Sequence, residues 1–294
     1  MNVLSLFDGI SGAKVALNRL GVPCTYFASE IDKYAIQISE KNHPDIIQLG
    51  DVTKINPLDL PKIDLLIGGS PCQDLSVAGR HKGLAGERSG LFYEYIWLLS
   101  ALQPDYFLLE NVRMKKAWEF VFNIYTGVKP ILIDSALVSG QQRRRLYWTN
   151  IPNVTQPEDR KIFLGDVIED GVVDRDKSYC IDASYYKGNT EDGYIKKCRR
   201  QIVYLYRLPH GYVTECTKQY DKYPSLAAQN PDTKYKIVDE FGFRKLTPVE
   251  CERLQTYDDG YTEGVSNTQR YKCLGNSFTV DVIKHILSFM GESQ

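Results

Sequence analysis

Long apolar runs are missing from this sequence of 294 residues. No stretch reaches the roughly 18 consecutive apolar residues that a membrane-crossing helix requires, and no basic segment precedes the first β-rich run, as it would in a secretory signal. We therefore expect a soluble, cytoplasmic protein. At this length, one large domain, or one with a smaller second domain, can bury a substantial hydrophobic core.

An excess of charge of one sign is also lacking. The 36 Lys and Arg residues nearly balance the 37 Asp and Glu residues, which gives a formal net charge of −1. This balance argues against a general polyanion binder, because non-specific affinity for nucleic acids comes mainly from neutralising phosphates. Basic clusters stand at 113–116, 143–145 and 196–200, and each of them taken alone is most simply a solvated face.

Signals of cysteine pairing are absent as well. The seven cysteines are an odd number and none of them form a C-x-x-C pair, so neither a disulfide framework nor a metal site is favoured. Reduced thiols fit the cytosol. The cysteines are Cys24, Cys72, Cys180, Cys198, Cys216, Cys251 and Cys273.

The first 110 residues instead alternate short β-rich runs with helical patterns, which is typical of βαβ units and a parallel sheet. Two later β-rich runs, 131–136 and 145–149, are predicted to close this sheet as an antiparallel pair. The predicted strands are 3–7, 26–28, 46–49, 63–67 and 106–109, and the predicted helices are 13–20, closed by Gly21, and 33–42. We expect an α/β fold whose ligands bind outside the carboxyl ends of the strands.

Regular patterns are lost between residues 152 and 243, where the chain is rich in Tyr, Asp, Lys and Gly. This composition suits a small, irregular, β-rich domain. A helix start returns at Thr247, with Pro248 at the first helical position and Glu250 three residues after the cap. Another helix is predicted over 279–290, and its apolar face requires it to fold back onto the sheet domain. We therefore expect one domain made of 1–151 and 245–294, and a second made of 152–244.

Two chemically informative side chains follow neighbouring predicted strands. Cys72 comes after 63–67, with glycines before it and polar residues after it, which is where a nucleophile would stand. Glu110 ends the strand 106–109. A thiol and a carboxyl group are thus expected at the same edge of the sheet.

Eight motifs in the same order identify a resemblance to the cytosine-C5 DNA methyltransferases that use S-adenosylmethionine (SAM). The flanking residues look like both the bacterial or phage enzymes and the animal de novo enzymes, and the bacterial or phage type is favoured because no chromatin-reading domain is attached. The resemblance implies a Rossmann-like class I methyltransferase domain with a small target-recognition domain at 152–244. The motifs lie at 6–12, 29–30, 50–52, 68–73, 110–112, 141–145, 246–251 and 275–277.

The same resemblance implies which residues hold SAM. Glycines 9 and 12 would let the main chain approach the carboxylate end of the cofactor at a helix N-terminus. Glu30 would hold the ribose hydroxyls, Asp51 the adenine amino group, and Ile31 stands where many relatives carry an aromatic residue. The implied cofactor residues are Phe7, Asp8, Gly9, Gly12, Glu30, Ile31, Asp51, Val52, Pro71, Leu91, Asn276 and Ser277.

The implied chemistry begins with Cys72. Carbon 5 of cytosine is a poor nucleophile, so a thiolate first adds to carbon 6, and carbon 5 then becomes enamine-like and accepts the methyl group. Arg143 and Arg145 would supply positive charge to the thiol, with Arg145 also holding the base, and Glu110 would bind N3 and the exocyclic amine. A base inside a duplex must be flipped out to be reached. The implied DNA contacts are Gln73, Ser76, Arg88 and Gln141, and no metal is implied.

Two alternatives stand beside a DNA methyltransferase. The related enzymes that methylate tRNA usually carry a Cys-Phe-Thr tripeptide, which this chain lacks. A non-catalytic regulatory homologue would be expected to have lost Cys72, Glu110 or the cofactor loop, and all of these are present. Double-stranded DNA is the expected partner, and a restriction endonuclease remains open as a partner in the cell.

Overall fold

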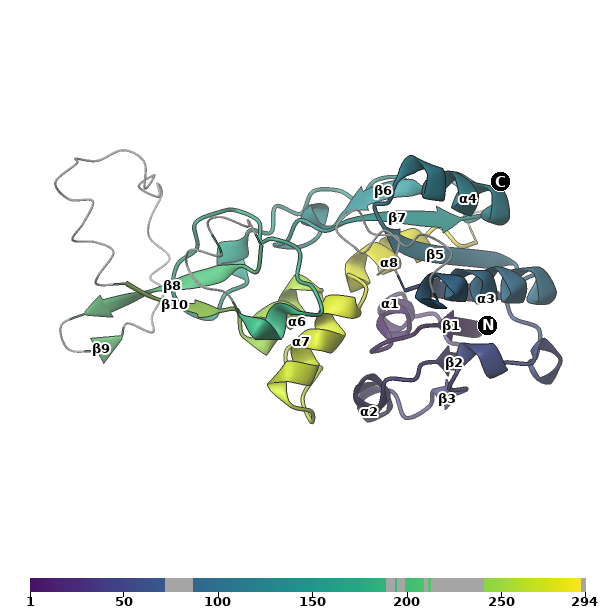
Figure 1. Cartoon of the computed structure of the whole chain (residues 1–294), viewed down its shortest axis with the longest axis horizontal. Coiled ribbons are helices and arrows are strands. Elements are labelled where there is room, and N and C mark those ends of the chain that lie inside the picture. The colour runs from purple at the N-terminus through teal and green to yellow at the C-terminus, as the bar shows by residue number, and fades with distance from the viewer. Residues whose placement is uncertain (72–86, 189–193, 195–198, 209–210, 213–240, 292–294) are drawn as a thin grey trace.

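The computed structural model describes residues 1–71, 87–188, 194, 199–208, 211–212 and 241–291. They form an elongated molecule with a large sheet covered by helices at one end and a three-stranded sheet at the other (Figure 1). The strands are β1 (Asn2–Leu6), β2 (Thr25–Ser29), β3 (Ile47–Gln48), β4 (Leu65–Gly69), β5 (Tyr106–Val112), β6 (Ile131–Asp134), β7 (Arg144–Thr149), β8 (Ile202–Leu208), β9 (Gly211–Tyr212) and β10 (Phe241–Lys245). The helices are α1 (Gly12–Arg19), α2 (Lys33–Asn42), α3 (Glu87–Leu102), α4 (Lys116–Thr126), α6 (Pro248–Leu254), α7 (Asn267–Asn276) and α8 (Val280–Leu287). In this described part, none of the helices is both long and apolar enough to cross a bilayer.

The large sheet has the strand order β3-β2-β1-β4-β5-β7-β6. Its first five strands are parallel, and β7 pairs antiparallel with both β5 and β6. The predicted α/β, Rossmann-like fold with a mostly parallel sheet is therefore confirmed, as is the antiparallel pair at its edge. The register places Gly69, the last residue of β4, opposite Glu110 of β5.

The central strands of this sheet are buried on both faces, so their residues divide between two hydrophobic clusters. Val3 of β1 and Ile67 of β4 belong to the cluster that contains α1 and α8. Their neighbours Leu4 and Leu66 point the opposite way, into the cluster that contains α3 and Trp148. This alternation, with period two, makes a three-layer arrangement of helix, sheet and helix.

Local sequence signals account for the helix boundaries. α1 ends in a Schellman motif: Gly21 has a φ of +68°, and the N–H of Val22 donates to the carbonyl of Leu17 at 3.0 Å. α6 begins with a capping box, in which the hydroxyl of Thr247 accepts from Glu250 N and the Glu250 carboxylate accepts from Thr247 N. As predicted, Gly21 closes the first helix and Thr247 caps the start of α6.

The C-terminal helix α8 folds back onto the sheet domain, as its apolar face predicts. Val280, Ile283 and Ile286 are fully buried, and α8 contacts α1 directly. Arg19 at the end of α1 also pairs with Asp281 at 3.0 Å. The first and last helices of the chain thus pack side by side in one layer.

The small sheet has the order β10-β8-β9 and is antiparallel throughout. The segment that leads to it is tied to the large sheet's domain by buried polar contacts. Lys177 Nζ donates to the carbonyls of Ala136, Ser139 and Ile162 at 2.5–3.0 Å. The ammonium group thus joins this segment to three main-chain carbonyls of the preceding part of the chain.

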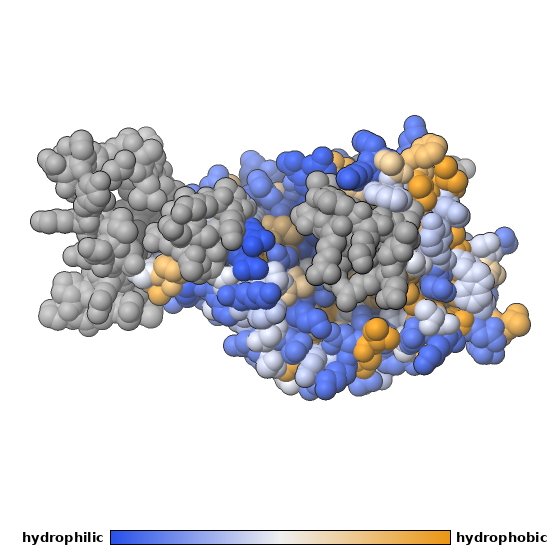
Figure 2. Space-filling model, in the orientation of Figure 1, coloured by the Kyte–Doolittle hydropathy of each residue, from blue (hydrophilic) through white to orange (hydrophobic). Residues whose placement is uncertain are grey.

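The surface is largely hydrophilic, with hydrophobic side chains gathered near α4 (Figure 2). Several large apolar residues of α3 and α4 are partly exposed there although their neighbours Phe92 and Phe122 stack in the core, with ring centroids 3.9 Å apart. These exposed residues are Tyr93, Trp97, Phe120, Ile124 and Tyr125. None of them borders the pocket described below.

A fully buried carboxylate holds the turn after α6. Glu252 accepts from Thr262 N at 2.8 Å and Gly260 N at 2.7 Å, and it pairs with Arg270 at 2.9 Å. We expect Glu252→Ala to lower the free energy of unfolding by about 3–5 kcal/mol, because Arg270 would lose its ion-pair partner and two main-chain amides would lose their acceptor. Urea denaturation measures this, with the exposed Glu40→Ala as the control. A loss under about 1 kcal/mol would contradict the expectation.

Candidate active site

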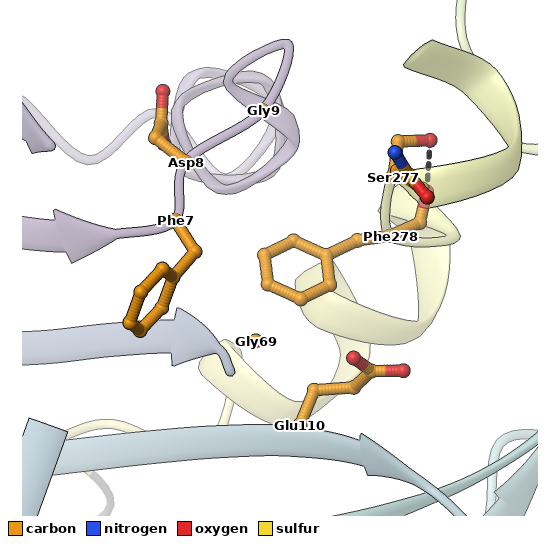
Figure 3. Close-up of a pocket in the computed structure, with 8 residues that line it drawn as sticks. Phe7, Asp8, Gly9, Gly69, Glu110, Ser277 and Phe278 are labelled. Carbon is orange, nitrogen blue, oxygen red and sulfur yellow. Dashed lines mark hydrogen bonds between the residues drawn. The ribbon is translucent and has the colours of Figure 1, made fainter. Parts of the chain in front are cut away.

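A pocket opens at the carboxyl ends of β1, β4 and β5, where the sheet topology predicts ligands to bind. The rings of Phe7 and Phe278 face one another across it, and the Glu110 side chain rises from β5 beneath them (Figure 3). The pocket is lined by Phe7, Asp8, Gly9, Gly69, Glu110, Asn276, Ser277 and Phe278. Residues from both ends of the chain and from two central strands therefore form one site.

The loop after β1 approaches the pocket with its main chain. Phe7 and Ser11 have φ values of +56° and +59°, which side-chain-bearing residues rarely adopt, and Gly9 lies between them at +60°. The Asp8 carboxylate points away from the pocket and accepts from the hydroxyls of Ser11 and Tyr26, both at 2.6 Å. Burial raises the pKa of Asp8. Asp8 thus holds the loop in shape and presents its main chain to the pocket.

Glu30 connects the end of β2 to this loop. One of its carboxylate oxygens accepts from Gly9 N at 2.8 Å, and the other accepts from the amides of Ile31 and Asp32 at 2.7 and 2.8 Å. The Ile31 side chain is 75% exposed. Glu30, the carboxylate expected to bind ribose, therefore also holds the loop after β1 in position through Gly9.

Other expected cofactor residues lie at neighbouring strand ends. Asp51 is partly exposed and accepts from the amide and hydroxyl of Thr53 at 3.0 and 2.9 Å, while Val52 is buried. Gly12 begins α1. Leu91 of α3 packs against the cluster around Trp148.

An ion pair joins β5 to β7 at the edge of the pocket. Glu110 Oε1 and Arg145 Nε are 2.9 Å apart, and each side chain is 15% exposed. The antiparallel register places Arg145 opposite Val112, so it is a diagonal neighbour of Glu110 on the same face. The structure thus brings together two of the expected catalytic residues, and the short loop leading to Cys72 lies beside them.

That loop is fixed by Asn111. Its side-chain amide donates to the Ser70 carbonyl at 3.1 Å and to the Ser70 hydroxyl at 3.0 Å. Pro71 follows and is the last described residue before Cys72. Cys72 itself, with Gln73 and Ser76, lies outside the described residues, and for Arg88 in α3 only the main chain is described.

Arg143 has a different position from the expected one. Its guanidinium is 4% exposed and donates to the carbonyls of Ile181 and Ser277 at 2.9 Å and of Gly275 at 3.3 Å, and to the sulfur of Cys180 at 3.2 Å. Four acceptors occupy it, so it is committed to holding the segment 275–277 in place. Cys72 lies outside the described residues, so the expectation that Arg143 supplies charge to its thiol stays a prediction.

Cys180 joins the site without any sequence signal that predicted it. Its sulfur is 3.2 Å from Arg143 Nη1 and 3.7 Å from Arg145 Nη2. Burial alone would raise the pKa of this thiol, but the two guanidiniums outweigh burial and lower it. Phe278 and Gly69 also line the pocket but were not among the expected site residues, although Gly69 lies in the motif 68–73 and Phe278 directly follows Ser277.

Gln141 was wrongly expected at the DNA interface. It is 0% exposed, and its side-chain nitrogen donates to Leu254 O at 2.7 Å and to Gln255 Oε1 at 2.8 Å. Its side-chain oxygen accepts from Ile181 N at 3.3 Å. Gln141 therefore connects α6 to the segment after β7 and has no surface that DNA could contact.

Comparisons with known proteins agree with this geometry. The sequence model of the family "C-5 cytosine-specific DNA methylase" matches residues 1–119 and 137–292. Type II methyltransferase M.NlaX of Neisseria lactamica is 30% identical over 98% of this chain and 95% of its own length. Type II methyltransferase M1.ScrFI of Lactococcus lactis subsp. cremoris is 30% identical over 99% of this chain and 78% of its own.

Two solved structures share the fold. Entamoeba histolytica methyltransferase EhMeth aligns with a TM-score of 0.71 at 19% identity, over 98% of this chain and 97% of that one. A mutant of Spodoptera frugiperda DNMT2 aligns with a TM-score of 0.66 at 20% identity, over 99% of each chain. The shared fold agrees with the family match over nearly the whole sequence, with the ordered motifs and with the Glu110–Arg145 pair at the pocket. The chain belongs to the C-5 cytosine-specific DNA methylase family and is a DNA cytosine-C5 methyltransferase.

Proposed function

We propose that this enzyme flips a cytosine out of duplex DNA, adds the Cys72 thiolate to carbon 6 and transfers a methyl group from SAM to carbon 5. The observation that carries this proposal is the Glu110–Arg145 pair, 2.9 Å apart, at the edge of the pocket and beside the loop that leads to Cys72. Family membership supports the same chemistry.

The pocket fits SAM in the kinds of groups that line it. Phe7 and Phe278 offer aromatic surface to the adenosine, and glycines 9 and 69 leave room for the main chain to approach a ligand. Glu30 and Asp51 follow the neighbouring strands β2 and β3, outside the pocket lining, and their carboxylate oxygens would accept from the ribose hydroxyls and the adenine amino group. When bound, SAM supplies an electrophilic methyl group.

The protein's own residues would prepare the base. As the thiolate forms its bond to carbon 6, the electrons of the double bond move towards N3. Glu110 takes up a proton from solvent and passes it to N3, and N3 gives this proton back when the thiolate leaves. Arg145 holds the Glu110 carboxyl group in position through the ion pair. After methyl transfer a base removes the carbon-5 proton, the thiolate leaves and the aromatic ring is restored. Solvent water is our candidate for that base.

Recognition of DNA is assigned to the second part of the chain. We propose that residues 152–244 form the target-recognition domain and that 1–151 with 245–294 form the catalytic domain. The buried contacts of Lys177 and Arg143 support this division, because they fix the start of the second part directly against the catalytic residues. The Type II names of the curated relatives favour a restriction endonuclease as a partner in the cell.

Methylation of purified nucleic acids tests the function. With labelled SAM, we expect label in carbon 5 of cytosine in duplex DNA and none in tRNA. Bisulfite sequencing of DNA from cells that express the protein would give the methylated site. Label in tRNA but not in DNA would contradict the proposal, and the same DNA premethylated by the enzyme and unlabelled SAM is the matched control.

A further inference from the structure

Two neighbouring helices expose more apolar surface than the fold of one chain uses. Trp97 of α3 is 47% exposed, and Phe120 and Ile124 of α4 are 63% and 61% exposed. Tyr93 and Tyr125, at 38% and 49%, join the two helices through a ring contact with centroids 5.5 Å apart. We call these five residues the α3–α4 surface, and Figure 2 shows hydrophobic side chains gathered near α4.

The size and rigidity of this surface suit a contact with another protein. At about 150–250 Å² for each complete side chain, the exposed fractions leave roughly 400–600 Å² of apolar area. This is as large as the largest patches on typical monomers, which are often functional, and it would form the centre of an interface that buries about 800 Å² per partner. The rings of Phe92, Tyr93 and Tyr125 contact one another, so these side chains lose little entropy on binding.

The charges beside the α3–α4 surface identify the kind of partner. Glu94 flanks it on α3, three residues before Trp97, and Lys116 flanks it on α4, four residues before Phe120. Lys116 pairs with Glu119 at 2.8 Å, yet its side chain is 90% exposed and has donors left for a second carboxylate. DNA is disfavoured as the partner because none of the five residues is cationic. With opposite charges on its two halves, the surface is complementary to a second copy turned by a two-fold axis.

We propose that two copies of this chain associate through the α3–α4 surface, with α3 of each copy lying against α4 of the other. In this isologous arrangement Trp97 packs on the partner's Phe120 and Ile124, and Glu94 meets the partner's Lys116, so that each contact occurs twice. None of the five residues lines the pocket, and the association therefore uses no residue of either pocket. It depends neither on SAM nor on the chemistry proposed above.

Analytical ultracentrifugation of the full chain tests the association. We expect a monomer–dimer equilibrium whose Kd rises at least about tenfold in Ile124→Glu, because a carboxylate then stands at the centre of the apolar contact. Ile47→Glu is the matched control, since Ile47 is 43% exposed on β3, at the edge of the large sheet farther from β7, which α4 contacts. This control should dimerise like the wild type. Both variants should keep the circular dichroism of the wild type, because both side chains are exposed.

Mixing two charge variants tests the orientation of the copies. Glu94→Lys and Lys116→Glu should each dimerise more weakly alone, because like charges would meet twice across the two-fold axis. An equimolar mixture should regain the affinity of the wild type, since opposite charges then meet at both places. A mixture that associates no better than either variant would overturn the proposed orientation. A wild type that is monomeric at every concentration, or a dimer that Ile124→Glu leaves intact, would overturn the association itself.

Discussion

Replacing Cys72 by alanine is expected to reduce methyl transfer by roughly 10⁴-fold or more, because no other group forms the bond to carbon 6. Binding of SAM should persist, since the pocket is lined by residues from other strand ends and from the C-terminal segment. Single-turnover transfer of labelled methyl groups and calorimetric titration with SAM measure the two quantities on the same protein.

Cys24→Ser is the matched control for loss of a thiol. Cys24 directly precedes β2, at the amino ends of the strands and thus at the opposite edge of the sheet from the pocket. The control should retain transfer. A duplex with 5-fluorocytosine at the methylated position should trap the wild type covalently, because fluorine cannot leave as a proton does. Turnover by Cys72→Ala, or an adduct on another residue, would exclude the proposed route.

Glu110→Gln is expected to lower the rate of transfer by about 10²–10³-fold. Glutamine keeps the shape of the side chain but cannot supply a proton to N3, and Arg145 loses the partner that lies 2.9 Å away. Affinity for SAM should change little, because the ring of Phe278 and the loop at Gly9 remain. Rates at saturating SAM and DNA, together with the Kd for SAM, separate the catalytic effect from binding.

Glu119→Gln offers a closely matched comparison. Its side chain is 16% exposed against 15% for Glu110, and it pairs with Lys116 at 2.8 Å on α4. Because Glu119 does not line the pocket, this variant should transfer at the wild-type rate. Equal rates for Glu110→Gln and Glu119→Gln would remove Glu110 from the mechanism.

Much of the sheet domain could be predicted because its signals are local. The helix predicted at 33–42 has those bounds in the structure, and the predicted strands differ from β1, β2 and β4 by only one or two residues at their ends. The alternating burial of the strands, the glycine at 21 and the capping box at Thr247 each determine the conformation of only the few residues around them. The folded structure keeps these local conformations because the contacts made by distant parts of the chain favour the same conformations.

The sequence was a poor guide where contacts with distant parts of the chain determine whether a residue is buried. Gln141 and Arg143 stand in a polar run that reads as exposed, yet partners more than 100 residues away bury both of them. Cys180 contacts Arg143 and Arg145 from a segment without regular patterns. Nothing close to these residues in the sequence indicates those partners. A motif can therefore identify a residue without showing which residues it contacts in the folded protein.

The two aromatic rings that face one another across the pocket, Phe7 and Phe278, have a consequence for how the protein is made. The second ring is synthesised 271 residues after the first. At the rates of ribosomal synthesis, the time between the two residues is roughly 14–54 s. During this time the strands can emerge and pair, but only one of the two rings that face the pocket is present. SAM bound as proposed would therefore not stabilise the nascent chain. It would bind only after residue 278 has been made, so a ribosome that stalls earlier would leave a chain with half of the proposed site.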